Sequence, residues 1–95
     1  MSNIRKYKDI TVYHPGFYLE NYIKDMKISQ AELAKRLEVW ERTLSLFIDG
    51  QIDISDDLAK RLSIVFGTSI QFWFNLQHAF EQKLVELVRA KYIDK

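Results

Sequence analysis

The chain has 95 residues, of which 47% are hydrophobic and 28% charged, and it contains no cysteine. This size fits one domain with a modest core, and the lack of cysteine excludes disulfide scaffolds, cysteine-ligated metal centres and thiol catalysis. A formal net charge of +1 excludes attachment to nucleic acid by bulk charge alone. No signal-peptide pattern and no apolar run of membrane length is visible, so we expect a cytoplasmic protein that does not enter a membrane.

The beginning of the chain differs in pattern from the rest. Residues 1–13 show a weak alternation of apolar side chains and are predicted to form an extended N-terminal arm. His14, Pro15 and Gly16 form a turn that ends this arm, and we expect the His14 ring to bond the backbone there. The remaining residues, 14–95, are predicted to form one helical domain with a helix at its C-terminal end.

Apolar side chains three and four residues apart predict five helices and no strand-rich region, which is an all-α fold. The first is expected over about 17–27, the second over 30–37 and the third over 41–48. Ser55 caps a fourth helix that Gly67 closes, and the fifth is expected over about 70–90. At the start of the second helix, Ser29 and Glu32 match a capping box, and Ala31 is expected to face the core with Leu33, Ala34 and Leu37.

The two short helices over 30–37 and 41–48 are separated by only three residues. This spacing is typical of a helix-turn-helix unit, in which the second helix protrudes and can enter a DNA major groove. The same spacing also occurs in small helical proteins that do not bind DNA, so further residues must decide.

Three motifs supply that information. Residues 29–34 (Ser-Gln-Ala-Glu-Leu-Ala) resemble the second helix of phage-repressor-like (XRE) domains. With the His-Pro-Gly turn and the segments Phe-Gly-Thr-Ser (66–69) and Phe-Trp-Phe-Asn-Leu-Gln (72–77), the stretch 14–82 resembles the HigA antitoxin family, also called plasmid-maintenance antidote or virulence-associated protein I. The resemblance implies a five-helix, lambda-repressor-like homodimer that binds a palindromic operator in double-stranded DNA. It also implies repression of the protein's own operon and neutralisation of a HigB-like toxin.

The same resemblance implies a set of DNA-binding residues. Gln30 matches a phosphate-anchoring position, and Arg42 has the planar fork that suits guanine or a phosphate pair. Thr43 is placed at the rim of the recognition helix. Lys35 and Arg36 either contact the DNA backbone or form a solvated face. The complete DNA-binding set is Gln30, Lys35, Glu41, Arg42, Thr43, Ser45 and Leu46.

The charge distribution supports a competing interpretation. Net charge is +3 over residues 1–37, −5 over 38–57 and +3 over 58–95, so the acidic stretch covers the recognition helix and its loop. Glu38 stands where the family usually has a glycine that favours positive φ, and Trp40 replaces the usual Ser/Thr cap. The alternative is therefore a protein-interaction module, toxin-neutralising or docking between domains, with weakened DNA binding. Such a module can also be the N-terminal domain of a longer protein with a metallopeptidase-like domain.

The remaining candidates concern interfaces and chemistry. Phe72 and Phe74 flank Trp73 and cannot both face the core, because neighbours on a helix diverge by ~100°, so a dimer or partner interface is predicted there. The two histidines lack metal-ligand spacing, so no metal site or cofactor is expected. No catalytic motif is present, so we do not expect an enzyme. Asn75 and Gln77 are expected to be structural polar groups near the core.

Overall fold

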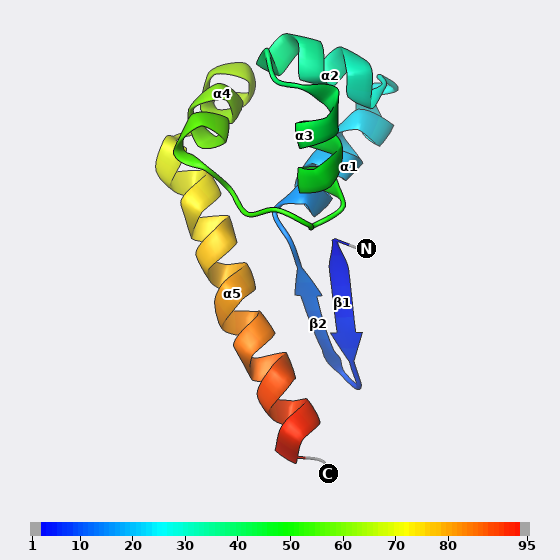
Figure 1. The fold of residues 1–95 in the computed structure, drawn as a ribbon, viewed down its shortest axis with the longest axis vertical. Coiled ribbons are helices and arrows are strands. Elements are labelled where there is room, and N and C mark those ends of the chain that lie inside the picture. The colour runs from blue at the N-terminus through cyan, green and yellow to red at the C-terminus, as the bar shows by residue number, and fades with distance from the viewer. Residues whose placement is uncertain (1–2, 94–95) are drawn as a thin grey trace.

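A computed structural model describes residues 3–93 (Figure 1). Five helices follow a two-stranded hairpin, so the all-α prediction is confirmed, with a small sheet that it did not include. The elements are β1 (Ile4–Tyr7), β2 (Ile10–Tyr13), α1 (Gly16–Met26), α2 (Gln30–Leu37), α3 (Glu41–Ile48), α4 (Asp56–Phe66) and α5 (Ile70–Ile93). The helix bounds agree with the expected ranges to within a few residues.

The main core lies between α1, α2, α3, α4 and the first turns of α5. Its fully buried side chains repeat at helical spacing on each short helix, as the amphipathic pattern requires. On α2 the buried stripe consists of Leu33, Ala34 and Leu37, but Ala31 is exposed, so its predicted inward position is wrong. At 100° per residue, Ala31 lies about 110° around the helix from the centre of that stripe.

The N-terminal hairpin forms a second layer beside α5. The arm predicted over 1–13, which the structure describes from residue 3, consists of β1 and β2 paired antiparallel, with Ile4 opposite Tyr13. Val12 packs with Phe80 and Leu87 of α5 in a small second core. The hairpin therefore runs along the C-terminal half of the long helix and away from α2 (Figure 1).

Helix α5 connects the two cores. Trp73, in its first turns, is buried in the main core and donates from Nε1 to Thr68 Oγ1 at 2.8 Å. Across residues 3–93, no helix is both long and apolar enough to cross a membrane. The long helix therefore serves as a scaffold for the small helices at one end and the hairpin at the other.

Candidate nucleic-acid interface

Helices α2 and α3 form the predicted helix-turn-helix unit. Ser29 Oγ accepts a hydrogen bond from the Glu32 amide at 3.1 Å, which starts α2 as expected. The second half of the predicted capping box is replaced, because the Glu32 carboxylate accepts from Arg36 Nε at 3.3 Å instead. The helix ends at Leu37, and Glu38 has φ 58°, the left-handed conformation expected at a glycine position. Glu38 is the first of the three residues that connect α2 to α3.

The outer face of α3 carries the predicted groove-facing residues. Leu44, Phe47 and Ile48 are buried against the other helices, which turns the opposite side outward. Glu41 and Arg42 are exposed, whereas Thr43, Ser45 and Leu46 are half-buried. On α2, Lys35 is exposed and Gln30 is half-buried. An outward surface therefore exists where a DNA groove would meet the unit, with its most accessible side chains in the first turn of α3.

Two cations on this surface are available to a ligand. Within the part of the chain that the structure describes, the side chains of Lys35 and Arg42 form no ion pair and no hydrogen bond. Arg36, in contrast, is paired with Glu32. Lys35 and Arg42 can therefore bind an anionic partner without first breaking a contact within the protein.

The acidic residues of the stretch 38–57 lie on different elements and have different partners. Asp53 Oδ1 accepts from Gln77 Nε2 of α5 at 3.0 Å, and Asp57 pairs with Arg61 of α4 at 2.9 Å. Glu41 and Asp49 are the two acidic residues on α3 or at its end. The acidic residues thus divide between α3 and its two ends, the loop at Asp53 and the first turn of α4. Arg61 offsets the charge of Asp57, whereas the bond from the neutral amide of Gln77 leaves the charge of Asp53 in place.

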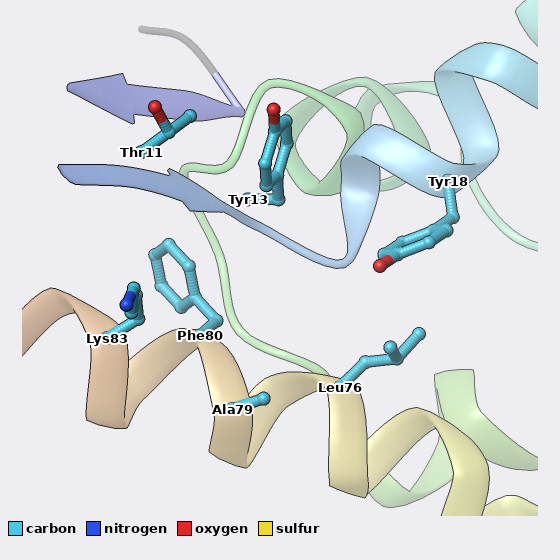
Figure 2. Close-up of a pocket in the computed structure, with 7 residues that line it drawn as sticks. All are labelled: Thr11, Tyr13, Tyr18, Leu76, Ala79, Phe80 and Lys83. Carbon is cyan, nitrogen blue, oxygen red and sulfur yellow. The ribbon is translucent and has the colours of Figure 1, made fainter. Parts of the chain in front are cut away.

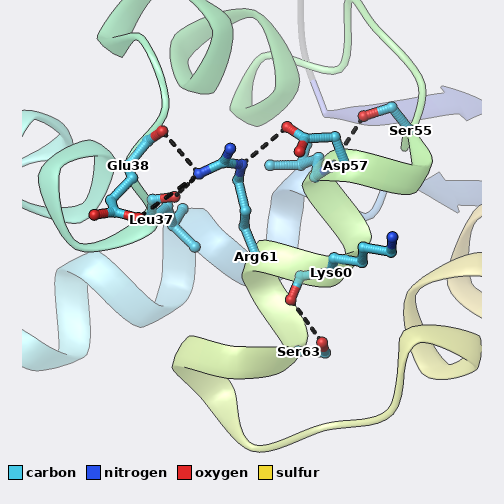
Figure 3. A network of polar contacts seen from close by, with 8 residues as sticks. Leu37, Glu38, Ser55, Asp57, Lys60, Arg61 and Ser63 are labelled. Atoms are coloured by element: carbon cyan, nitrogen blue, oxygen red, sulfur yellow. Dashed lines mark hydrogen bonds and ion pairs between the residues drawn. The ribbon is translucent and has the colours of Figure 1, made fainter.

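The turn between α2 and α3 is held by Arg61, which sequence reasoning missed (Figure 3). Its Nη1 donates to the carbonyl oxygens of Leu37 at 3.2 Å and Glu38 at 3.0 Å. Its Nε donates to Asp57 at 2.9 Å. The i,i+4 spacing of Asp57 and Arg61 is visible in the sequence, but the contacts across 23 and 24 residues are not.

The opposite end of α3 is held by the hairpin. The buried Asn3 donates from Nδ2 to the Ile48 carbonyl at 2.9 Å, and Arg5 donates from Nη2 to the Gly50 carbonyl at 3.2 Å. The last carbonyls of a helix have no partner within the helix, so Asn3 caps α3 at Ile48, while Arg5 holds the residues that follow it. Sequence reasoning missed both residues because each bond spans 45 positions.

The His-Pro-Gly turn brings α1 against the same end of α3. A Cβ on Gly16 would lie 2.1 Å from the Phe47 carbonyl oxygen, so only glycine permits this approach. His14 Nδ1 accepts from the Gly16 amide at 2.9 Å, which leaves Nε2 to donate to the Ile52 carbonyl at 2.9 Å. The expected bonding of the His14 ring to the backbone is confirmed, and burial lowers the pKa of His14 below 6.5.

The two predicted interface aromatics lie in different environments. Phe72 is 41% exposed and meets Trp73 edge-on, whereas Phe74 is half-buried against the main core. Gln77 is buried as expected and accepts from the Ile54 amide at 3.0 Å, but Asn75 is exposed. The two phenylalanines thus diverge as helix geometry requires, and of the two Phe72 has the more accessible ring.

Away from the helix-turn-helix unit, a hollow of about 280 Å³ opens between β2, α1 and α5 (Figure 2). Its walls include the rings of Tyr13 and Tyr18 and the side chain of Lys83, which also pairs with Glu86. None of the predicted DNA-binding residues lines it. Over residues 3–93, no group of three or more acidic, histidine or cysteine side chains is placed to hold a metal ion.

Comparison with known proteins agrees with this geometry. The family model described as "Helix-turn-helix" matches residues 19–73. Virulence-associated protein I of Dichelobacter nodosus is 37% identical, over 82% of this chain and 73% of that protein. A HigA-family addiction module antidote from Coxiella burnetii has a TM-score of 0.75 at 34% identity, covering 85% of this chain and 89% of that one.

A third similar protein was solved with DNA. The structure of the Pseudomonas aeruginosa antitoxin HigA with the higBA promoter has a TM-score of 0.72 at 37% identity. The likeness covers 84% of this chain and 88% of that one.

Proposed function

This chain belongs to the helix-turn-helix family, in its HigA-like branch, and we propose that it regulates transcription by placing α3 in the major groove of its operator. The exposed first turn of α3, with Arg42 free of any partner among the described residues, carries the proposal. The guanidinium reads guanine O6 and N7 or binds a phosphate pair, while Gln30 and Lys35 fix the register on the backbone. Glu41 accepts from cytosine N4, and Ser45 and Leu46 contact the groove from the second turn.

We further propose that the chain acts as a homodimer on a palindromic site. Two copies of α3 then enter successive major grooves about 34 Å apart. The exposed ring of Phe72 on α5 is the proposed centre of the dimer contact, because a large apolar side chain gains most by leaving water. Neutralisation of a HigB-like toxin is proposed by analogy with the similar proteins, which include an addiction module antidote and an antitoxin. The direct check is to co-express this chain with a toxin encoded beside its gene and to measure whether growth is rescued.

A titration with two DNA duplexes tests the DNA-binding proposal. One covers the region directly upstream of the chain's reading frame, and the other is a scrambled duplex of equal length and composition. Fluorescence anisotropy at low and moderate salt should give tighter binding to the upstream duplex and an affinity that falls as salt rises. Arg42→Ala should lose about 1–3 kcal/mol on the upstream duplex. Arg89→Ala provides the control, since Arg89 is exposed on the far half of α5. Failure of the wild-type chain to bind either duplex at low salt would refute DNA binding and leave the protein-interaction alternative.

A further inference from the structure

The direction of α3 depends on a turn that is unfavourable on its own. Glu38 has φ 58°, a left-handed conformation in which the Cβ of a non-glycine residue crowds its own backbone. Val39 and Trp40 then complete the connection, and α3 starts without a side-chain cap. A turn of this kind persists only where its surroundings hold it in place.

Arg61 provides that support from a separate helix. Its Nη1 contacts both the Leu37 and Glu38 carbonyl oxygens and lies 3.9 Å from the Glu38 carboxylate (Figure 3). A cation at the C-terminal end of α2 is also favoured by the helix dipole. Helix α4 is in turn anchored in the core by Leu58, Ala59 and Leu62, so the guanidinium extends from a rigid base.

Asp57 orients the guanidinium. Its Oδ2 accepts from Arg61 Nε at 2.9 Å, one turn earlier on α4. The planar fork of arginine can bond Asp57 through one edge and the carbonyl oxygens through another. The single ammonium group of a lysine cannot reproduce that arrangement.

We propose that Arg61 is a positioning residue for DNA recognition: it holds the turn at Glu38 and thereby sets the angle at which α3 meets the groove. The inference rests on the proposed function. Arg61 uses Nε and Nη1 inside the protein, so it acts through α3 rather than by contact with a base. Loss of its geometry should therefore reduce sequence discrimination more than it reduces general attraction to DNA.

Arg61→Lys is the test variant because it preserves the charge. Lys60→Arg is the matched control, since Lys60 is an exposed cation beside Arg61 on α4 and its side chain forms no ion pair within the described residues. Residual dipolar couplings of the amides in α2 and α3 measure the angle between these helices without any DNA. The ratio of affinities for the upstream and scrambled duplexes measures discrimination, at a temperature where circular dichroism shows each variant folded.

The expected results differ between the two variants. Arg61→Lys should shift or average the couplings of α3 and lower the affinity ratio about tenfold, the size of one lost base contact. Lys60→Arg should leave the couplings and the ratio close to wild type. Adding Glu38→Gly to Arg61→Lys should restore much of the ratio, because glycine adopts positive φ without support.

Unchanged couplings of α3 in Arg61→Lys would overturn the inference, whether or not DNA binds. If the wild-type chain binds the upstream duplex, an affinity ratio of Arg61→Lys equal to that of wild type would also overturn the inference. If the wild-type chain binds neither duplex, the proposed function fails, and the couplings alone decide the role of Arg61.

Discussion

Replacing Glu38 with glycine should stabilise the fold. The left-handed conformation of Glu38 costs about 1–2 kcal/mol for a residue with a Cβ. Glycine removes this cost but gains freedom in the unfolded chain, which offsets about 0.4–1 kcal/mol. The ion pair lost with the carboxylate is 3.9 Å long, and the Glu38 side chain is 84% exposed, so its contribution is close to zero. The balance is a gain of about 0.5–1 kcal/mol in the free energy of unfolding.

Thermal unfolding followed by circular dichroism measures this gain. For a domain of this size, a gain of that order raises the Tm by about 3–6 °C. Glu38→Ala is the matched control, because it removes the same carboxylate but retains the Cβ that is strained at positive φ. The glycine variant should therefore be more stable than wild type, and the alanine variant should not.

A glycine variant no more stable than the alanine variant would refute the reasoning. It would mean that Arg61 and the neighbouring helices make the left-handed turn favourable for any residue. Both variants also remove a negative charge beside α3, so their affinity for the scrambled duplex should rise at low salt and converge on wild type at high salt. That shared effect separates the loss of charge from the relief of strain.

Three further predictions concern His14 and two aromatic residues of α5. Burial holds the pKa of His14 below 6.5, so under acidic conditions the unfolded chain binds more protons than the folded one. The free energy of unfolding should therefore be at its full value above about pH 6.5 and should fall as the pH drops through the folded-state pKa of His14. Thermal unfolding between about pH 7.5 and pH 5 measures this loss, and His14→Gln should reduce the pH dependence whereas substitution of the exposed His78 should not. Phe74→Ala should lower the unfolding free energy by about 2 kcal/mol, because its ring packs on the main core. Phe72→Ala should preserve stability and shift the sedimentation profile from dimer toward monomer, and an unchanged profile would remove the proposed interface.

Local signals in the sequence predicted the helical part of the fold well. Serine caps mark where α2 and α4 begin, and apolar spacing indicates the extent of α2, α3 and α4; both signals are local in the sequence. The positive φ of Glu38 was also predictable, because the position is usually glycine in the family that the motifs indicate. These predictions required no knowledge of which helix packs against which.

The contacts that position α3 could not be predicted in the same way. Arg61 reaches the turn from another helix, and Asn3 reaches the end of α3 across 45 residues. The sequence predicts only an extended arm at the position of the hairpin, because the weak alternation of apolar residues does not reveal the pairing of the strands or their packing on α5. Likewise, the net charge along the sequence does not show that Asp53 accepts from Gln77 of α5. Each of these features depends on tertiary geometry.

The hydrogen bonds of Asn3 and Arg5 couple the local unfolding of the N-terminal hairpin to that of the end of α3. When the hairpin separates, Asn3 leaves the Ile48 carbonyl and Arg5 leaves the Gly50 carbonyl, so the last turn of α3 frays in the same event. The turn at Lys8 and Asp9 lies at the far end of the hairpin from α3 (Figure 1). A protease that cuts this exposed turn would therefore loosen the end of α3 without touching it. The hairpin and α3 belong to one cooperative unit, although neither borders the other in sequence.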